Sequence, residues 1–109
     1  MADIKELTNN NFKEEVINNK GVVLVDFYAE WCKPCKIMIP SIKELNDEFN
    51  GKVKICKADV EENSDIVGNL GISSVPSVVI FKSGSVVSRE TGLRSKEDIK
   101  NDLDETCNG

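Results

Sequence analysis

Two cysteines separated by two residues, Cys32 and Cys35, form the pattern in this sequence that most directly indicates chemistry. They follow an apolar, β-prone run at residues 22–28 and precede a stretch with helical periodicity. A helix beginning at this pair would turn backbone N–H groups and partial positive charge toward Cys32, and both favour a thiolate. The spacing also places Cys35 on the same side of the first turn. The pattern predicts disulfide exchange, in which Cys32 attacks and Cys35 resolves.

A single Cys-x-x-Cys pair is also typical of half a structural zinc site. The chain has no histidine, so such a site would need four cysteine thiolates. The remaining cysteines, Cys56 and Cys107, are isolated and lie in different predicted elements. The absence of histidine likewise disfavours a Cys–His hydrolase. The sequence therefore favours a redox pair, and we expect neither a metal nor a cofactor.

Length and charge narrow the class of protein. The 109 residues suffice for one core, so we expect a single domain over residues 1–109. The net charge of −5 is spread along the chain, whereas a nucleic-acid site needs a concentrated basic face. No stretch approaches the roughly 18–20 apolar residues of a membrane span, and residues 1–20 are rich in Asn, Lys and Glu. We therefore expect a cytoplasmic protein that binds neither nucleic acid nor a membrane.

Hydrophobic periodicity and capping residues predict the elements that position the pair. Helices are predicted from Asn10 or Asn11 to about Asn19, over residues 34–50 with a kink at Pro40, near residues 65–70, and from Ser95 onward. Strands are predicted over residues 22–28, 53–59, 77–82 and 86–91, with a hairpin turn at residues 83–85. Strands alternate with helices early and a hairpin comes late, so we expect an α/β fold with a mixed sheet covered on both faces.

The sequence around the cysteines resembles the active-site segment of the thioredoxin family. The matching segment is Val25-Asp26-Phe27-Tyr28-Ala29-Glu30-Trp31-Cys32-Lys33-Pro34-Cys35-Lys36. Further matches in the family's order and spacing are Val75-Pro76, Lys57 with Asp59, Phe81-Lys82-Ser83-Gly84, and Gly92. The resemblance implies the thioredoxin fold, a central five-stranded mixed β-sheet flanked by four α-helices, and the activity of a protein disulfide reductase.

Two charged residues in the matching segments bear on proton transfer. Asp26 lies within an apolar strand, where its carboxylate would lose hydration and its pKa should rise. The resemblance implies that Asp26 accepts the Cys35 proton, directly or through water, and that Lys57 pairs with this acid. The alternatives are an aspartate satisfied by backbone amides at a strand end and a solvated strand lysine.

The resemblance also implies a surface where substrates dock. A cis Val75–Pro76 bond would place backbone groups of Val75 beside the cysteines, where they could pair with an extended substrate segment. The substrate-binding residues implied in this way are Trp31, Lys33, Pro34, Val75, Pro76, Gly92 and Leu93. A core position for Trp31 is the alternative.

Lys33 departs from the family motif, which usually has glycine at this position. A positive charge near Cys32 should stabilise the thiolate relative to the disulfide and make the pair more oxidising. A solvated Lys33 whose charge is screened by salt would have little effect, and the sequence leaves both possibilities open. Tyr28 and Ser77, where the family often has Trp and Thr, are milder departures.

Our first hypothesis is a monomeric protein disulfide reductase that acts on disulfide-containing target proteins and is re-reduced by a thioredoxin reductase. A disulfide oxidase or isomerase of the same fold would be favoured if Lys33 raised the reduction potential strongly. A binding module without redox turnover is the third hypothesis. We expect Cys56 to be a buried, inert thiol and Cys107 to be exposed.

Overall fold

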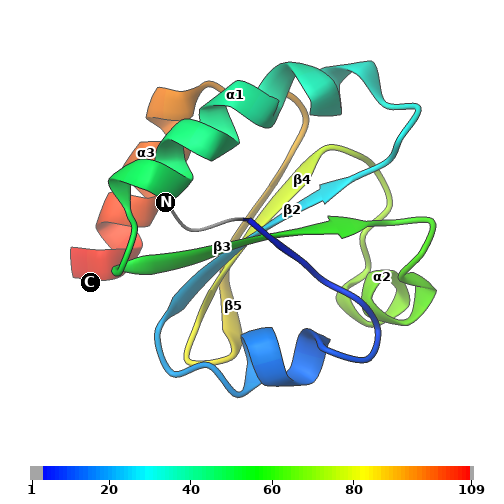
Figure 1. Cartoon of the computed structure of the whole chain (residues 1–109), viewed down its shortest axis with the longest axis horizontal. Helices are drawn as coiled ribbons and strands as arrows, with labels where there is room; N and C mark the ends of the chain where they lie inside the picture. The colour runs from blue at the N-terminus through cyan, green and yellow to red at the C-terminus, as the bar shows by residue number, and fades with distance from the viewer. Residues whose placement is uncertain (1–3, 109) are drawn as a thin grey trace.

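Five strands form one mixed sheet in the computed structural model, which describes residues 4–108 (Figure 1). The strand order is β1-β3-β2-β4-β5. Strands β1 (Lys5–Glu6) and β2 (Val22–Tyr28) run parallel to β3 (Val53–Asp59), which lies between them. Strand β4 (Ser77–Lys82) runs antiparallel to both β2 and β5 (Ser85–Thr91). The expectation of a five-stranded mixed sheet is confirmed.

Helices cover both faces of this sheet. Helices α1 (Lys33–Glu48) and α3 (Lys96–Asn108) lie on one face, and η1 (Lys13–Ile17) and α2 (Ser64–Leu70) lie on the other (Figure 1). The four expected helices are present, but η1 is a single π-helical segment rather than an α-helix. The predicted cap of α3 is confirmed, because the Asp98 N–H donates to Ser95 Oγ at 3.1 Å.

Alternation along β2 divides the core into two layers. Val22 and Leu24 pack toward α1 and α3, whereas Val23, Val25 and Phe27 pack toward η1 and α2. The strand is central and buried on both faces, which explains why its sequence is a nearly continuous apolar run. The same alternation turns Asp26 toward the α1 face of the sheet.

The first helix begins differently from the prediction. The Thr8 N–H donates to Asn11 Oδ1 at 2.8 Å, and the Asn11 N–H donates to Thr8 Oγ1 at 3.1 Å. Thr8 and Asn11 therefore cap each other reciprocally one turn before η1. The N-cap residue of η1 is Phe12, with no side-chain cap hydrogen bond, so the prediction that Asn10 or Asn11 caps a helix to about Asn19 was wrong. The sequence Thr8-Asn-Asn-Asn11 offers several capping residues in a row, and composition does not distinguish among them.

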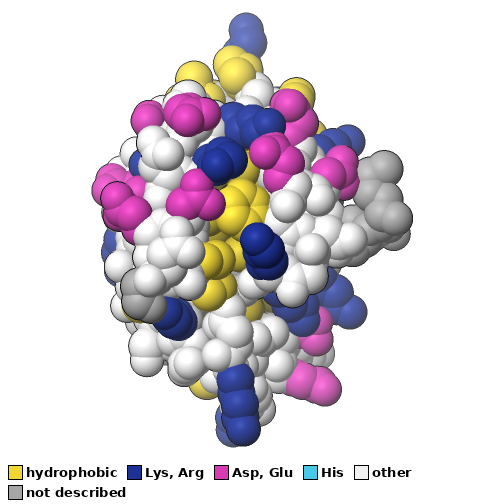
Figure 2. All heavy atoms as spheres, turned by 90° about the vertical axis from the view of Figure 1, so that its left-hand side faces the viewer, with side chains coloured by type: hydrophobic (Ala, Val, Ile, Leu, Met, Phe, Trp, Pro, Cys, Tyr) yellow, Lys and Arg dark blue, Asp and Glu magenta, His cyan; other side chains and the backbone are white. Residues whose placement is uncertain are grey.

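Helix α1 continues through Pro40 and ends at Glu48, two residues before the predicted end. The domain predicted over residues 1–109 includes residues 1–3 and 109, which lie outside the described part. Within residues 4–108, no helix combines the length and apolar character needed to cross a membrane. Figure 2 shows Lys and Arg side chains interspersed with Asp and Glu over one face of the molecule, in keeping with the even spread of charge along the sequence.

Candidate active site

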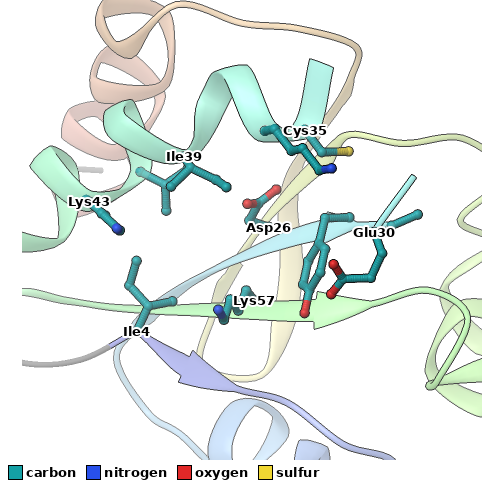
Figure 3. Close-up of a pocket in the computed structure, with 11 residues that line it drawn as sticks. Ile4, Asp26, Glu30, Cys35, Ile39, Lys43 and Lys57 are labelled. Carbon is teal, nitrogen blue, oxygen red and sulfur yellow. The ribbon is translucent and has the colours of Figure 1, made fainter. Parts of the chain in front are cut away.

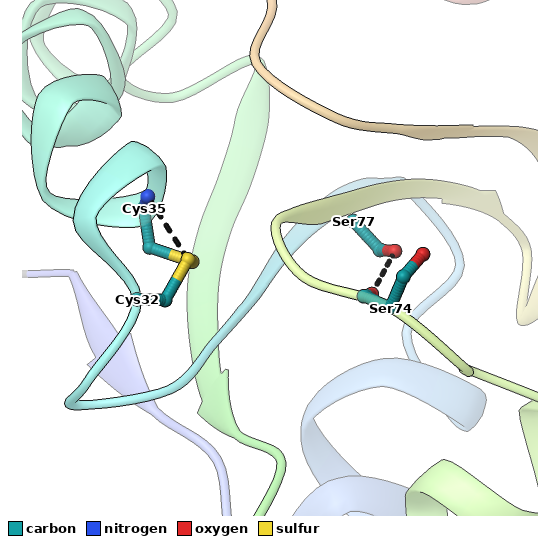
Figure 4. The surroundings of a disulfide bond; sticks show 4 residues. All are labelled: Cys32, Cys35, Ser74 and Ser77. Carbon is teal, nitrogen blue, oxygen red and sulfur yellow. Dashed lines mark hydrogen bonds between the residues drawn. A yellow bond between two sulfur atoms is a disulfide. The ribbon is translucent and has the colours of Figure 1, made fainter.

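Cys32 and Cys35 lie where the loop after β2 enters the first turn of α1 (Figure 4). Their Cα atoms are 5.3 Å apart, and a disulfide joins the two sulfurs. Cys32 is the N-cap residue, and its Sγ accepts a hydrogen bond from the Cys35 N–H at 3.2 Å. Pro34 occupies the first turn, where its missing N–H removes no helical hydrogen bond. The start of α1 therefore turns donors and partial positive charge toward Cys32.

The disulfide is embedded in a small apolar cluster. Each cysteine is only 3% exposed and packs with Ala29, while Tyr28, Val60 and Val75 are partly buried against them. The Val75–Pro76 peptide bond is cis, as the resemblance implied. In the same loop, Ser77 Oγ donates to the Ser74 carbonyl at 2.7 Å (Figure 4). Val75 therefore brings the cis-proline loop against the cysteine pair.

A second hydrogen bond ties the segment after β5 to this loop. The Gly92 N–H donates to the Pro76 carbonyl at 2.8 Å, and the following residue, Leu93, is 54% exposed. Two segments predicted to dock substrates are thus joined directly. Leu93 presents an apolar side chain to solvent beside them.

The third predicted docking segment precedes the helix. Trp31 is 69% exposed, which rules out the alternative of a core tryptophan, and its Nε1 donates to Glu61 Oε2 at 3.2 Å. Lys33 and Pro34 are also exposed at the start of α1. The indole is therefore an exposed apolar group immediately before Cys32 in the chain.

Asp26 is a buried acid next to the cysteine pair. Its residue is 5% exposed, and among the described residues Oδ1 has no hydrogen-bond partner. Burial raises the pKa of Asp26 to about 7, the positive charge of Lys57 opposes that rise, and the negative charge of Glu6 adds to it. The carboxyl group can therefore gain and lose a proton near neutral pH.

Lys57 lies beside Asp26 across the β2–β3 pair but contacts a different acid. Its Nζ is 3.7 Å from Glu6 Oε1 and 5.9 Å from the centre of the Tyr28 ring. Among the ion pairs of residues 4–108, Lys57 has Glu6 as its partner and makes no salt bridge to Asp26. The lysine thus acts on Asp26 through its charge and not through direct contact.

Asp26, Cys35 and Lys57 line one cavity of about 310 Å³ beneath α1. Figure 3 shows Cys35 on the helix, Asp26 on the strand below it and Lys57 on the neighbouring strand. A cavity of this size can hold several water molecules, each of which takes up about 30 Å³ in the liquid. Water can therefore carry a proton between Asp26 and the solvent.

The other two cysteines lie apart from the pair. Cys56 is fully buried in β3 on the η1 and α2 side, where burial raises its pKa to about 11, and Cys107 is exposed near the end of α3. The four sulfurs therefore do not converge. Across residues 4–108 no group of three or more metal-ligating side chains is gathered in one place.

Comparison with known proteins shows which family this chain resembles. The family model described as Thioredoxin matches residues 3–105. A thioredoxin of Buchnera aphidicola subsp. Acyrthosiphon pisum is 41% identical over 108 residues, which cover 99% of this chain and 100% of the relative. A thioredoxin of Rickettsia felis is 42% identical over 93 residues, covering 85% and 89%. Thioredoxin 2 of Chlorobaculum tepidum is 43% identical over 100 residues, covering 92% of each.

The chain belongs to the thioredoxin family. It is a protein-disulfide oxidoreductase that acts by dithiol–disulfide exchange, and the bonded pair Cys32–Cys35 supplies the two sulfurs. The fold and the activity implied by the resemblance are both confirmed.

Three residues of the site were not predicted from the sequence. Val60 packs against the disulfide, Glu61 accepts from Trp31, and Glu6 pairs with Lys57. Val60 and Glu61 directly follow β3, so their position after a strand parallel to the one that leads to the cysteines was a usable signal. Glu6 lies in a two-residue strand, which is too short to show any periodicity.

Proposed function

We propose that this chain reduces disulfide bonds in other proteins, with Cys32 as the attacking cysteine and Cys35 as the resolving cysteine. The observation that carries the assignment is the N-cap position of Cys32, whose Sγ accepts the Cys35 N–H. Donors aimed at a sulfur stabilise its thiolate, and the thiolate is the nucleophile in disulfide exchange. Cys35, inside the first turn, lacks that position.

The cycle begins with the pair reduced. The Cys32 thiolate attacks one sulfur of the target disulfide, forms a mixed disulfide and releases the other target sulfur as a thiolate. The Cys35 thiolate then attacks Cys32 Sγ, closes the Cys32–Cys35 bond and releases the second target thiolate. Two electrons pass from the pair to the target, and the pair ends in the bonded form that the structure describes.

Asp26 is the base for the second step. In its ionised form it accepts the Cys35 proton, directly or through a water molecule in the shared cavity, and so generates the attacking thiolate. The pKa of about 7 supports this role because a base that titrates near the working pH can both take and return a proton. Lys57 tunes this acid through its charge.

The substrate would dock on the exposed side chains around the pair. Trp31, Pro34 and Leu93 offer apolar contacts, Lys33 contributes a positive charge, and Gly92 leaves room for a close approach of the target backbone. The backbone of Val75, before Pro76, is the proposed edge for strand-like pairing with an extended target segment. The exposure of Trp31 and Leu93 supports this surface.

We further propose a monomer that works in the cytoplasm and is re-reduced by a thioredoxin reductase. A reducing role suits the cytoplasm, where thiols are kept reduced. Family membership supports the reductase as the electron donor, because the pair needs two electrons to start a new cycle.

The test is reduction of insulin by dithiothreitol, followed as turbidity. The wild-type chain should accelerate precipitation, and Cys32→Ser should abolish the acceleration, while Cys107→Ser should match the wild type. Acceleration that survives Cys32→Ser would contradict the proposal. Capture of partners that persists after both Cys32 and Cys35 are replaced would instead favour a non-redox binding module.

A further inference from the structure

Three charged residues stand side by side across the sheet near the cysteine pair. Glu6 of β1 is the register partner of Lys57 in β3, and Lys57 is the register partner of Asp26 in β2. Register partners in parallel strands point to the same face, so all three side chains lie on the α1 side of the sheet. One lysine therefore stands between two acids.

Lys57 is held by Glu6, on the side away from Asp26. The Lys57 ammonium lies 3.7 Å from Glu6 Oε1, and both residues have side chains that are 45% exposed. The Tyr28 hydroxyl is 2.9 Å from Glu6 Oε1 and 3.0 Å from Oε2, so it donates to this carboxylate. The Lys57 ammonium also lies over the Tyr28 ring, 5.9 Å from its centre. Tyr28 thus fixes both members of the pair.

We propose that Glu6 is a positioning residue for disulfide exchange: anchored by Tyr28, it draws the Lys57 ammonium away from Asp26 and thereby strengthens the hold of Asp26 on the Cys35 proton. This inference rests on the proposed role of Asp26 as the base. A direct Lys57–Asp26 salt bridge would stabilise the carboxylate and weaken its affinity for a proton.

Among the charged groups around Asp26, Glu6 is the acid that raises its pKa. Lys36 and Lys43 of α1 and Glu30 of the preceding loop line the cavity with Asp26, Cys35 and Lys57, whereas the register partner in β4 is the apolar Val78. Burial, Lys57 and Glu6 are, in that order, the causes that set the pKa of Asp26, and Glu6 acts to raise it. Removing the Glu6 charge should lower that pKa directly and also release Lys57 toward Asp26.

The step affected is a proton transfer followed by a thiol exchange. The Cys35 thiol gives its proton to the Asp26 carboxylate, and the resulting Cys35 thiolate attacks Cys32 Sγ and expels the target thiolate. Protonated Asp26 then returns its proton to water in the cavity. Glu6 takes no part in bond making and acts only through Lys57 and its own charge.

The experiment compares Glu6→Gln with the wild type in two measurements. The titration of the Asp26 carboxyl carbon is followed by NMR in the oxidised protein, and the pH profile of the resolving step is followed by stopped-flow with a disulfide peptide. In Glu6→Gln both midpoints should move to lower pH by about half a pH unit, which is roughly a threefold larger carboxylate fraction below the midpoint.

Four further variants complete the design, of which Asp26→Asn tests the base itself. Glu6→Asp should move the midpoints less, since it keeps the charge, and Tyr28→Phe should also shift them less, since the anchor is lost but the charge remains. Glu14→Gln removes one negative charge from an exposed position in η1, on the other face of the sheet, and should leave both midpoints unchanged.

The outcomes distinguish failure of the Glu6 role from failure of the proposed role of Asp26 as the base. If both midpoints stay in place in Glu6→Gln, or move equally in Glu14→Gln, the role of Glu6 is overturned, and unshifted midpoints in Tyr28→Phe overturn its anchoring by Tyr28. If Asp26→Asn leaves the resolving rate and its pH profile unchanged, the role of Asp26 as the base fails instead. A slowed Asp26→Asn together with an unshifted Glu6→Gln rejects the inference alone.

Discussion

Asp26 retains its proton in the folded chain up to a pH of about 7, whereas an aspartate in an unfolded chain ionises near 3.9. Above pH 7 the folded protein therefore contains a buried carboxylate whose Oδ1 has no hydrogen-bond partner among the described residues. The folded state binds this proton more tightly than the unfolded state, so the contribution of Asp26 to stability is fully present below pH 3.9 and is lost as the pH rises through about 7. Ionised Asp26 therefore lowers the stability of the folded protein above neutral pH.

Replacement of Asp26 with asparagine should remove this pH dependence. Between pH 4 and pH 8 the free energy of unfolding of the wild type should fall by roughly 3–4 kcal/mol relative to Asp26→Asn, because only the wild type must ionise a buried group. Urea denaturation of the two oxidised proteins across this range measures the difference. A difference that stays constant with pH would show that the Asp26 pKa is not raised.

Lys33 is the first residue of α1, and its positive charge can change the reduction potential of the cysteine pair. It is exposed there, next to the N-cap cysteine. We predict that Lys33→Gly lowers the reduction potential of the pair by roughly 10–20 mV, because an exposed charge contributes at most about 1 kcal/mol.

Equilibration with glutathione at low salt measures this potential. Lys33→Met is the matched variant, since it removes the charge without adding glycine flexibility, and it should shift the potential in the same direction. No change in both variants would mean that the charge is screened by solvent, and a rise would also reject the prediction.

At the scale of elements, the β4–β5 hairpin depends on one glycine. The turn residues Ser83 and Gly84 have φ angles of 51° and 81°, the positive values that a two-residue type I′ turn requires. A Cβ on Gly84 would lie 2.2 Å from the backbone oxygen of Ile17, which is much too close. This turn therefore packs tightly against the end of η1.

Gly84→Ala should lower the free energy of unfolding by roughly 2–4 kcal/mol, since it combines positive φ with a backbone clash. Gly51→Ala is the control, because Gly51 also has a positive φ, 88°, but open space around its Cβ position. It should cost only about 1 kcal/mol. Equal losses in urea denaturation would show that the contact with Ile17 contributes nothing.

Elements with strong periodicity could be predicted, and those without it could not. The apolar run of β2, the helical stripe of α1 and the Ser95 cap of α3 each carry their own local signal. Strand β1 has two residues, and its pairing with β3 depends on tertiary contacts alone. The reciprocal Thr8–Asn11 cap was missed because several neighbouring side chains could serve as caps.

The same limit applies to the site. The cysteine pair and the buried Asp26 could be predicted from the sequence, because the Cys-x-x-Cys spacing and the apolar run around Asp26 are local signals. The partner of Lys57 could not, because Glu6 and Asp26 are both its neighbours and only side-chain geometry decides between them. The departure at Tyr28, which looked mild in the sequence, provides the hydroxyl that anchors Glu6.

At the scale of the whole molecule, the sheet brings distant segments to one reactive pair. The loop after β2 supplies Cys32, the cis-proline loop supplies Val75, and the segment after β5 is attached through Gly92. A docked target protein would contact all three segments, and the disulfide is buried beneath the surface that they form. The central claim is that electrons leave this assembly through Cys32.

Trapping the mixed disulfide tests that claim most directly. Reduced Cys35→Ser, incubated with a disulfide-containing peptide, should form a stable adduct because the resolving thiol is absent, and peptide mapping by mass spectrometry should place the adduct on Cys32. Adding Cys107→Ser to the variant should leave the yield unchanged. An adduct found on Cys56 or Cys107, or one that still forms in Cys32→Ser, would contradict the claim.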